Sequence, residues 1–155
     1  MRMRVSVLAA ALAATLLACG WAATPARAAV PPTARRITAA ALAARIRKGE
    51  RPLIFQVGFE ELYAAAHIPG ARYAGPASQP QGMARLRAAL AKLPRSRAVI
   101  LYCGCCPWPK CPNIRPATRA ALEMGFRHLE VLYLPHSFAR DWVRRGYPIA
   151  GRDAR

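Results

Sequence analysis

The sequence predicts a single α/β domain in which a parallel sheet has helices on both faces. Two observations support this fold class. Short apolar runs typical of buried strands alternate along the chain with segments whose apolar residues recur at helical spacing. The chain of 155 residues also has room for one domain with a sizeable core. The sequence contains no internal repeat, so a solenoid is not expected.

The first half of the domain is expected to form helix, strand, helix and strand. Thr38 is suited to cap a helix at 39–48, which a glycine then ends. The apolar run 52–57, Pro-Leu-Ile-Phe-Gln-Val, predicts a short strand. Two glutamates open the helix expected at 59–66, where the helix dipole favours acidic side chains. A turn then leads into a brief strand at 72–74.

The second half of the domain is expected to repeat the alternation. Apolar residues at helical spacing predict a helix at 83–93, which a proline ends. The run 98–102, Ala-Val-Ile-Leu-Tyr, predicts a fully buried strand. A cysteine-rich loop follows, and then a helix at 117–124, a strand at 129–134 and a last helix at 137–145. These alternating elements predict parallel pairing of the strands.

Residues 1–28 predict a secretory signal peptide. A short basic head precedes an apolar run at 5–18, and Ala26-Arg27-Ala28 offers a cleavage site. An alternative exit is a lipoprotein signal at 1–18, because Leu16-Leu17-Ala18-Cys19 is similar to a bacterial lipoprotein box that would place a lipid on Cys19. Either route predicts a domain in the periplasm or cell envelope.

The mature chain is expected to have three parts. Residues 29–36, which contain two prolines and no periodicity, predict a linker. The domain itself is expected at 37–150, and residues 151–155 are expected to form a basic tail.

The strongly basic charge limits the classes of partner. The formal net charge is +17; with the three arginines of the leader removed, 21 basic and 7 acidic residues leave +14. The arginines are dispersed singly, and together with the export signal this argues against a nucleic-acid partner. A positive domain of this kind would attract small anions, and it could associate with a membrane surface, through a lipid on Cys19 if that residue is acylated.

The four cysteines outside the leader lie within nine positions, Cys103, Cys105, Cys106 and Cys111. A disulfide framework would be spread along the chain, so this cluster belongs to a local site. Cys103 directly follows the buried strand, and ligands of α/β sheets bind at the carboxyl ends of strands. The helix expected at 117–124 would present its amino end and lower the pKa of the Cys103 thiol.

The residue types around Cys103 predict a nucleophile with an anion site. The backbone N–H groups of the loop at Gly104 and Cys105, together with the Arg115 guanidinium, are expected to bind an anionic substrate. The alternative is that Cys103 is a small buried apolar residue without chemistry. The spacing required for a cysteine-phosphatase loop or for haem attachment is absent from the sequence.

The other three cysteines admit several interpretations. Cys105 or Cys106 could form a disulfide with Cys111, as a structural bridge or as a redox pair that attacks a Cys103 persulfide. Alternatively, Cys103, Cys105, Cys106 and Cys111 could bind Cu(I) or Zn, although C-x-C-C-x4-C lacks the two separated pairs of a typical zinc site. Free thiols are the third possibility, and the sequence leaves these alternatives open.

Several motifs resemble the rhodanese-like domain family over residues 37–149. They are His67-Ile68-Pro69-Gly70-Ala71 after a strand and helix, Tyr102-Cys103 ending a buried strand, Gly125-Phe126 after the next helix, and Trp142 followed by Gly146-Tyr147-Pro148. The resemblance implies a five-stranded parallel α/β fold. It also implies that Cys103 carries sulfane sulfur as a persulfide, with a small anionic sulfur donor, a thiol acceptor and no cofactor.

The chain departs from the family pattern at three places. Gln56-Val57-Gly58 stands where an Asp-Val-Arg-like triplet is usual, and Pro135-His136 replaces a Gly-Gly pair. The loop from Cys103 to Arg115 is longer than the family's and holds three additional cysteines. These departures concern the substrate, thiosulfate above all, more than the fold. We therefore predict an exported sulfurtransferase, with a soft-metal or redox-active thiol binding module on a catalytically idle fold as the alternative.

Overall fold

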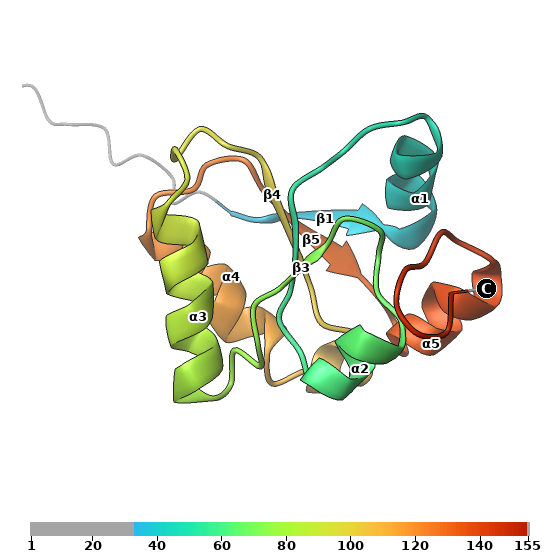
Figure 1. Ribbon diagram of the computed structural model, residues 1–155. Helices are drawn as coiled ribbons and strands as arrows, with labels where there is room; N and C mark the ends of the chain where they lie inside the picture. Colours follow the sequence, from blue (N-terminus) through green and yellow to red (C-terminus); the bar gives the residue numbers. More distant parts are fainter. Residues whose placement is uncertain (1–32, 155) are drawn as a thin grey trace, which may run out of the picture. The chain divides into compact units, whose positions relative to one another are not determined.

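The computed structural model describes residues 33–154, which form one α/β domain (Figure 1). Its strands are β1 (Arg35–Thr38), β2 (Ile54–Gln56), β3 (Arg72–Tyr73), β4 (Val99–Tyr102) and β5 (Leu129–Tyr133). Its helices are α1 (Ala39–Arg47), α2 (Glu60–Ala65), α3 (Pro80–Ala91), α4 (Ile114–Glu123) and α5 (Phe138–Asp141), with 3₁₀ helices η1 (Trp108–Lys110) and η2 (Val143–Arg145). The five strands pair in parallel in the order β1-β5-β4-β2-β3.

The alternation of side chains along the strands divides the core into two layers. In β4, Val99 and Leu101 belong to one buried cluster, whereas Ile100 and Tyr102 belong to the other. Helices α3 and α4 cover the first face of the sheet, and α1 and α5 cover the second (Figure 1). Strand β4 is central and buried on both faces, which explains its all-apolar sequence. The parallel sheet with helices on both faces confirms the predicted fold class.

The linker predicted at 29–36 is too long at its C-terminal end, because Arg35 and Arg36 belong to strand β1 of the sheet. Both side chains are exposed, so the strand carries little of the apolar pattern that sequence analysis depends on. Arg35 lies opposite Glu130 of β5 in the register and forms an ion pair with it. This edge strand is therefore held by backbone pairing and cross-strand charge.

Helix α4 begins at Ile114, three residues before the predicted start. Pro116 lies in its first turn, where a backbone N–H has no partner within the helix and a proline is tolerated. The expected last helix is divided into α5 and η2. The expected basic tail is partly fastened to the domain, because the backbone N–H groups of Arg152 and Asp153 donate to the carbonyls of Ala64 and Ala65, at 3.0 Å each.

The predicted leader and the N-terminal part of the predicted linker lie outside the described residues. Within residues 33–154, no helix combines the length and the apolar character needed to cross a membrane.

A carboxylate fastens the start of α5 beside the cysteine-rich loop. Asp141 accepts hydrogen bonds from the backbone N–H groups of His136, at 2.6 Å, and Ser137, at 3.0 Å, and from the His136 ring, at 2.9 Å. Burial opposes ionisation of this carboxyl, but these hydrogen bonds outweigh it and lower the pKa of Asp141. The next residue, Phe138, donates its N–H to the carbonyl of Gly104 at 3.0 Å.

We predict that Asp141→Asn lowers the free energy of unfolding by about 1–2 kcal/mol, because it removes a charged acceptor from three donors. A carboxyl with a lowered pKa in the folded state stabilises the fold at pH values above its ordinary pKa. That contribution is lost as the pH falls through the lowered pKa, so the difference between the two proteins should shrink in acid. Urea unfolding of both proteins, from neutral pH down to acid, measures this difference in the free energy of unfolding. Asp153→Asn is the control, because the Asp153 side chain makes no hydrogen bond within the described domain; equal losses for both variants would contradict the prediction.

Candidate active site

Cys103 lies at the carboxyl end of β4, at the position that the sequence predicts for a nucleophile. It is followed by Gly104, whose positive φ of 87° turns the chain away from the sheet. A Cβ on Gly104 would lie 2.5 Å from Cβ of Phe138, so the loop can approach α5 this closely only with glycine. The backbone thus fixes Cys103 between β4 and α5, with 5% of the residue exposed.

The loop brings three sulfur atoms together. The sulfur atoms of Cys103, Cys105 and Cys111 all lie within 4.8 Å of one another, and we call this group the sulfur cluster. The Cys103 and Cys105 sulfurs are 3.3 Å apart. Cys106 lies outside the cluster but its sulfur is 3.1 Å from that of Cys105. All four cysteines are free thiols, so the predicted disulfide between Cys111 and Cys105 or Cys106 is not formed in this structure.

Asn113 is a site residue that sequence analysis missed. It is fully buried, and its side-chain N–H₂ donates to the sulfurs of Cys103, at 3.4 Å, and Cys105, at 3.8 Å. Its side-chain carbonyl accepts from the backbone N–H of Ser78 at 2.9 Å. An asparagine just before a helix ordinarily caps that helix, but this side chain makes no capping hydrogen bond with α4. The only sequence signal was a polar residue between Cys111 and the helix.

The negative charge of the cluster is expected on Cys111. The Cys103 thiol, followed by the backbone N–H groups of Ile114 and Asn113, lowers the pKa of Cys111 to about 5. The neighbouring Cys111 and burial raise the pKa of Cys103. Burial, followed by its cysteine neighbours, raises the pKa of Cys106 to about 12. The lower pKa of the pair is thus on Cys111 and the higher on Cys103, which favours a thiolate on Cys111, whereas the sequence predicts one on Cys103.

The difference between the two thiols has a structural cause. Because α4 begins at Ile114, Cys111 lies nearer to the unpaired N–H groups of the first turn than Cys103 does. The N–H of Cys105 points at the Cys103 sulfur and favours its ionised form, as predicted for the loop, but burial and the Cys111 charge outweigh this effect.

Cys103 opens into a pocket of about 420 Å³. The pocket is lined mostly by apolar residues of α2, α5 and the cysteine-rich loop, and Gly104 and Cys105 are among them. Asp153 is the only charged side chain of the described lining. A Cβ on Gly58 would lie 3.1 Å from the Cys103 sulfur, so the close approach of this backbone depends on glycine. The sulfur is thus reachable from one side, despite its low exposure.

Gln56 stands where the family more often has an acidic residue. Its side chain lines the pocket beside Cys103 and is 2% exposed. Its side-chain carbonyl oxygen has no hydrogen-bond partner among the described residues. A buried acceptor without a partner costs free energy, and a bound donor with an N–H or O–H group would satisfy it.

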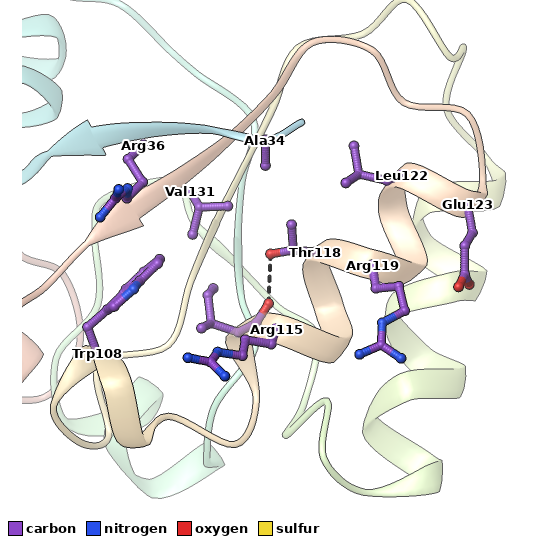
Figure 2. A pocket seen from close by; sticks show the side chains of 10 residues that line it. Ala34, Arg36, Trp108, Arg115, Thr118, Arg119, Leu122, Glu123 and Val131 are labelled. Carbon is purple, nitrogen blue, oxygen red and sulfur yellow. Dashed lines mark hydrogen bonds between the residues drawn. The ribbon is translucent and has the colours of Figure 1, made fainter. Parts of the chain in front are cut away.

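Arg115 does not line the Cys103 pocket. Figure 2 shows it in the first turn of α4, at a separate pocket of about 590 Å³ that it shares with Arg36, Trp108 and Arg119. Its side chain is exposed. The predicted anion-binding pair of Cys103 and Arg115 is therefore not formed in this structure, because the two residues line different pockets.

The comparisons with known proteins agree with this geometry. The family model of the rhodanese-like domain matches residues 38–139. The chain has no match among curated proteins. Among solved structures, a protein of Bacillus halodurans superimposes with a TM-score of 0.59 at 23% identity, over 77% of this chain and 79% of that one. The rhodanese-like domain of an Anabaena protein gives 0.56 at 23% identity, over 80% and 82%.

A thiosulfate sulfurtransferase from Pseudomonas aeruginosa is also similar, with a TM-score of 0.55 at 18% identity. The match covers 79% of this chain but 21% of that one, so the likeness concerns one domain of a longer protein. At these identities the solved structures establish the fold alone. Since the family model spans most of the described domain, this chain belongs to the rhodanese-like domain family.

Proposed function

We propose that this protein is an exported sulfurtransferase of the periplasm or cell envelope that carries sulfane sulfur as a persulfide on Cys103. The observation that supports the proposal is the Cys103 sulfur at the carboxyl end of β4, facing a pocket of about 420 Å³ in a rhodanese-like domain. The partners would be a small sulfur donor and a thiol acceptor, with no cofactor and no nucleic acid. If Cys19 is lipidated, the domain would work at a membrane surface.

The sulfur cluster supplies the proton acceptor that the first step needs. A thiol becomes a nucleophile only as a thiolate, and Cys103 keeps its proton at rest. The ionised Cys111 lies within 4.8 Å of it and can take that proton as Cys103 attacks the outer sulfur of the donor. The bond between the two donor sulfurs breaks, the donor leaves as a thiol or sulfite, and Cys103 keeps the transferred sulfur as a persulfide.

The pocket favours a donor of low charge. The described lining contains no Lys or Arg, and its one charged residue, Asp153, would repel an anion. A hydropersulfide carries at most one charge at its reactive end, whereas thiosulfate is a dianion that loses hydration on entering an apolar pocket. A hydropersulfide or polysulfide therefore suits this site better than thiosulfate.

Intact mass after exposure to a sulfur donor tests the proposal. We expect that reduced protein treated with inorganic tetrasulfide takes up sulfur at Cys103, which stays as a persulfide where no second thiol removes it, and that Cys103→Ser takes up none, although Cys105 also lines the pocket. To keep the adduct from being consumed by a second thiol, the measurement is made in a Cys111→Ser background as well as in the wild type. Peptide mapping locates the added sulfur; sulfur that remains on the Cys103→Ser protein would refute the assignment.

We propose soft-metal binding as a second candidate function, favoured by one observation. Three sulfur atoms within 4.8 Å, two of them buried, form a donor set of the kind that suits Cu(I). Titration of the reduced protein with Cu(I) against a colorimetric chelator tests this candidate. One tightly held ion in the wild type, lost in Cys105→Ser, would support it. Copper left entirely with the chelator would exclude it.

A further inference from the structure

Sulfur transfer through Cys103 requires one cysteine, but the loop supplies two more sulfurs at contact range. Cys105 and Cys111 both lie with Cys103 in a group whose sulfurs are within 4.8 Å of one another. Cys111 is 7% exposed and precedes the first turn of α4, so a solution thiol or donor has little access to it. Its closest chemical partner is the sulfur of Cys103.

Cys103 lines two spaces of different character. One is the pocket of about 420 Å³, which Cys103 and Cys105 line and Cys111 does not. The other is a cavity of about 10 Å³ that Cys103 and Cys111 line together with Trp108, Ile114 and Leu132. A space of this size is at the lower limit for a single water molecule. The donor must therefore arrive from the larger pocket, where Cys111 is not among the lining residues.

From this arrangement we infer that Cys111 is a resolving cysteine: its sulfur attacks a Cys103 persulfide and releases the transferred sulfur as sulfide. The product of the step on the protein is a Cys103–Cys111 disulfide. The inference rests on the proposed function, because it requires a persulfide on Cys103. It makes the protein a reductase of sulfane sulfur, which is a further activity beyond transfer to an external thiol.

The step balances without a further reactant. After loading, Cys103 carries a persulfide anion and Cys111 carries the proton that it took from Cys103. The Cys111 sulfur forms a bond to the inner sulfur of Cys103, and the bond between the inner and outer sulfurs breaks. The outer sulfur takes the Cys111 proton and leaves as HS⁻. The outer sulfur gains two electrons, and the two cysteine thiols supply them by becoming a disulfide.

The space that each cysteine lines distinguishes Cys111 from Cys105, whose sulfur is 3.3 Å from that of Cys103. Displacement at sulfur requires the attacking and leaving sulfurs to lie on opposite sides of the sulfur between them. A persulfide that extends into the larger pocket has its outer sulfur in the space that Cys105 lines, whereas Cys111 lines only the small cavity. Of the two cysteines, Cys111 is thus the one that does not share the space of the leaving sulfur.

A thiol that the fold holds beside its target outcompetes one from solution. Intramolecular groups that are well oriented act at effective concentrations far above those of dissolved thiols. The Cys103–Cys111 disulfide must then be reduced before the next cycle, and the reductant is by chemical class a dithiol that exchanges with it. The protein would therefore pass electrons from such a dithiol to sulfane sulfur.

A sulfur-loading experiment without oxygen tests the inference. The protein is treated with inorganic tetrasulfide, the reagent is removed, and the cysteines are analysed by peptide mapping. We expect the wild type to hold the Cys103–Cys111 disulfide and no persulfide. Cys111→Ser should accumulate the Cys103 persulfide, with an increase of at least about tenfold over the wild type, because the resolving sulfur is absent. Loading does not depend on the Cys111 thiolate in this variant, because Cys111 is the largest cause of the raised pKa of Cys103 and its removal lets Cys103 ionise. Cys105→Ser should still end with the Cys103–Cys111 disulfide, and Cys106→Ser, the matched removal of a thiol outside the sulfur cluster, should behave like the wild type.

Two other results would overturn the inference, and they differ in what they leave standing. A wild-type protein that keeps a stable Cys103 persulfide, or a persulfide that accumulates in Cys105→Ser instead of Cys111→Ser, refutes the role of Cys111 and leaves sulfur transfer intact. If neither the wild type nor Cys111→Ser takes up sulfur at Cys103, the proposed function fails and the inference fails with it.

Discussion

One thiolate per molecule, titrating near pH 5, is the expected result when the ultraviolet absorbance of the reduced protein is followed against pH. The expectation follows from Cys111, whose pKa is lowered from its ordinary value of 9.0 to about 5 by the Cys103 thiol and by the backbone N–H groups of Ile114 and Asn113. A spectroscopic titration suits this buried group because it needs no reagent to enter the site. Cys103 and Cys106, whose pKa values are raised, should contribute only at higher pH.

Two variants identify the source of the absorbance. Cys111→Ser should remove the low-pH step, whereas Cys106→Ser should retain it, because Cys106 has a raised pKa of about 12 and lies outside the sulfur cluster. A first step near the ordinary value of 9.0, or one that survives in Cys111→Ser, would contradict the assignment of the charge.

The same ionisation has a consequence for stability. A group whose pKa is lower in the folded state than in the unfolded chain stabilises the fold fully above its ordinary pKa, and this contribution is lost as the pH falls to the lowered value. For Cys111, stability should thus rise between pH 5 and pH 9. The raised pKa of Cys103 has the opposite sign and lowers stability above pH 9, where unfolding lets that thiol ionise. Urea unfolding of the reduced protein at a series of pH values measures both the rise in stability below pH 9 and the fall above it.

The fold could be predicted from the sequence because its strongest signals are local. The run at β4 is apolar at every position, and its burial on both faces explains why. Where the local signal is weak, the prediction failed. Arg35 and Arg36 lie in an exposed edge strand, where pairing with β5 replaces the apolar pattern. The helix predicted at 117–124 begins earlier, at Ile114, because the first turn of a helix accepts Pro116.

The site could be predicted only as far as its position along the chain. The sequence indicated that Cys103 ends a buried strand, and the structure places it there. Whether Cys103 or Cys111 is ionised depends on which sulfur lies nearer to the N–H groups of α4, and this follows from the path of the loop in space. The direction of Arg115 depends on the rotation of α4, which an uncertain helix start leaves undetermined.

Asn113→Asp is expected to suppress both the low-pH thiolate and sulfur loading. The substitution keeps the shape of the side chain and the acceptor for the Ser78 N–H, 2.9 Å from the side-chain oxygen. It replaces the donor that faces the sulfurs of Cys103 and Cys105, at 3.4 and 3.8 Å, with a carboxylate oxygen. The thiolate expected on Cys111 lies within 4.8 Å of both sulfurs, and two negative charges a few ångströms apart repel by about 2–4 kcal/mol at an effective dielectric constant of about 20.

The carboxylate and the thiolate of the cluster should therefore not both be ionised. We expect the thiolate step of Asn113→Asp to move up by about two pH units, and persulfide formation near neutral pH to fall by about a hundredfold. Asn113→Ala is the comparison, because it removes the donor without adding charge and also leaves the Ser78 N–H without its partner. It should lose more stability than Asn113→Asp in urea, yet shift the titration less. An Asn113→Asp protein with an unchanged midpoint would mean that Asn113 only supports the loop. A shift in the midpoint without a matching loss of stability identifies it as the residue that positions the sulfur cluster and sets its charge.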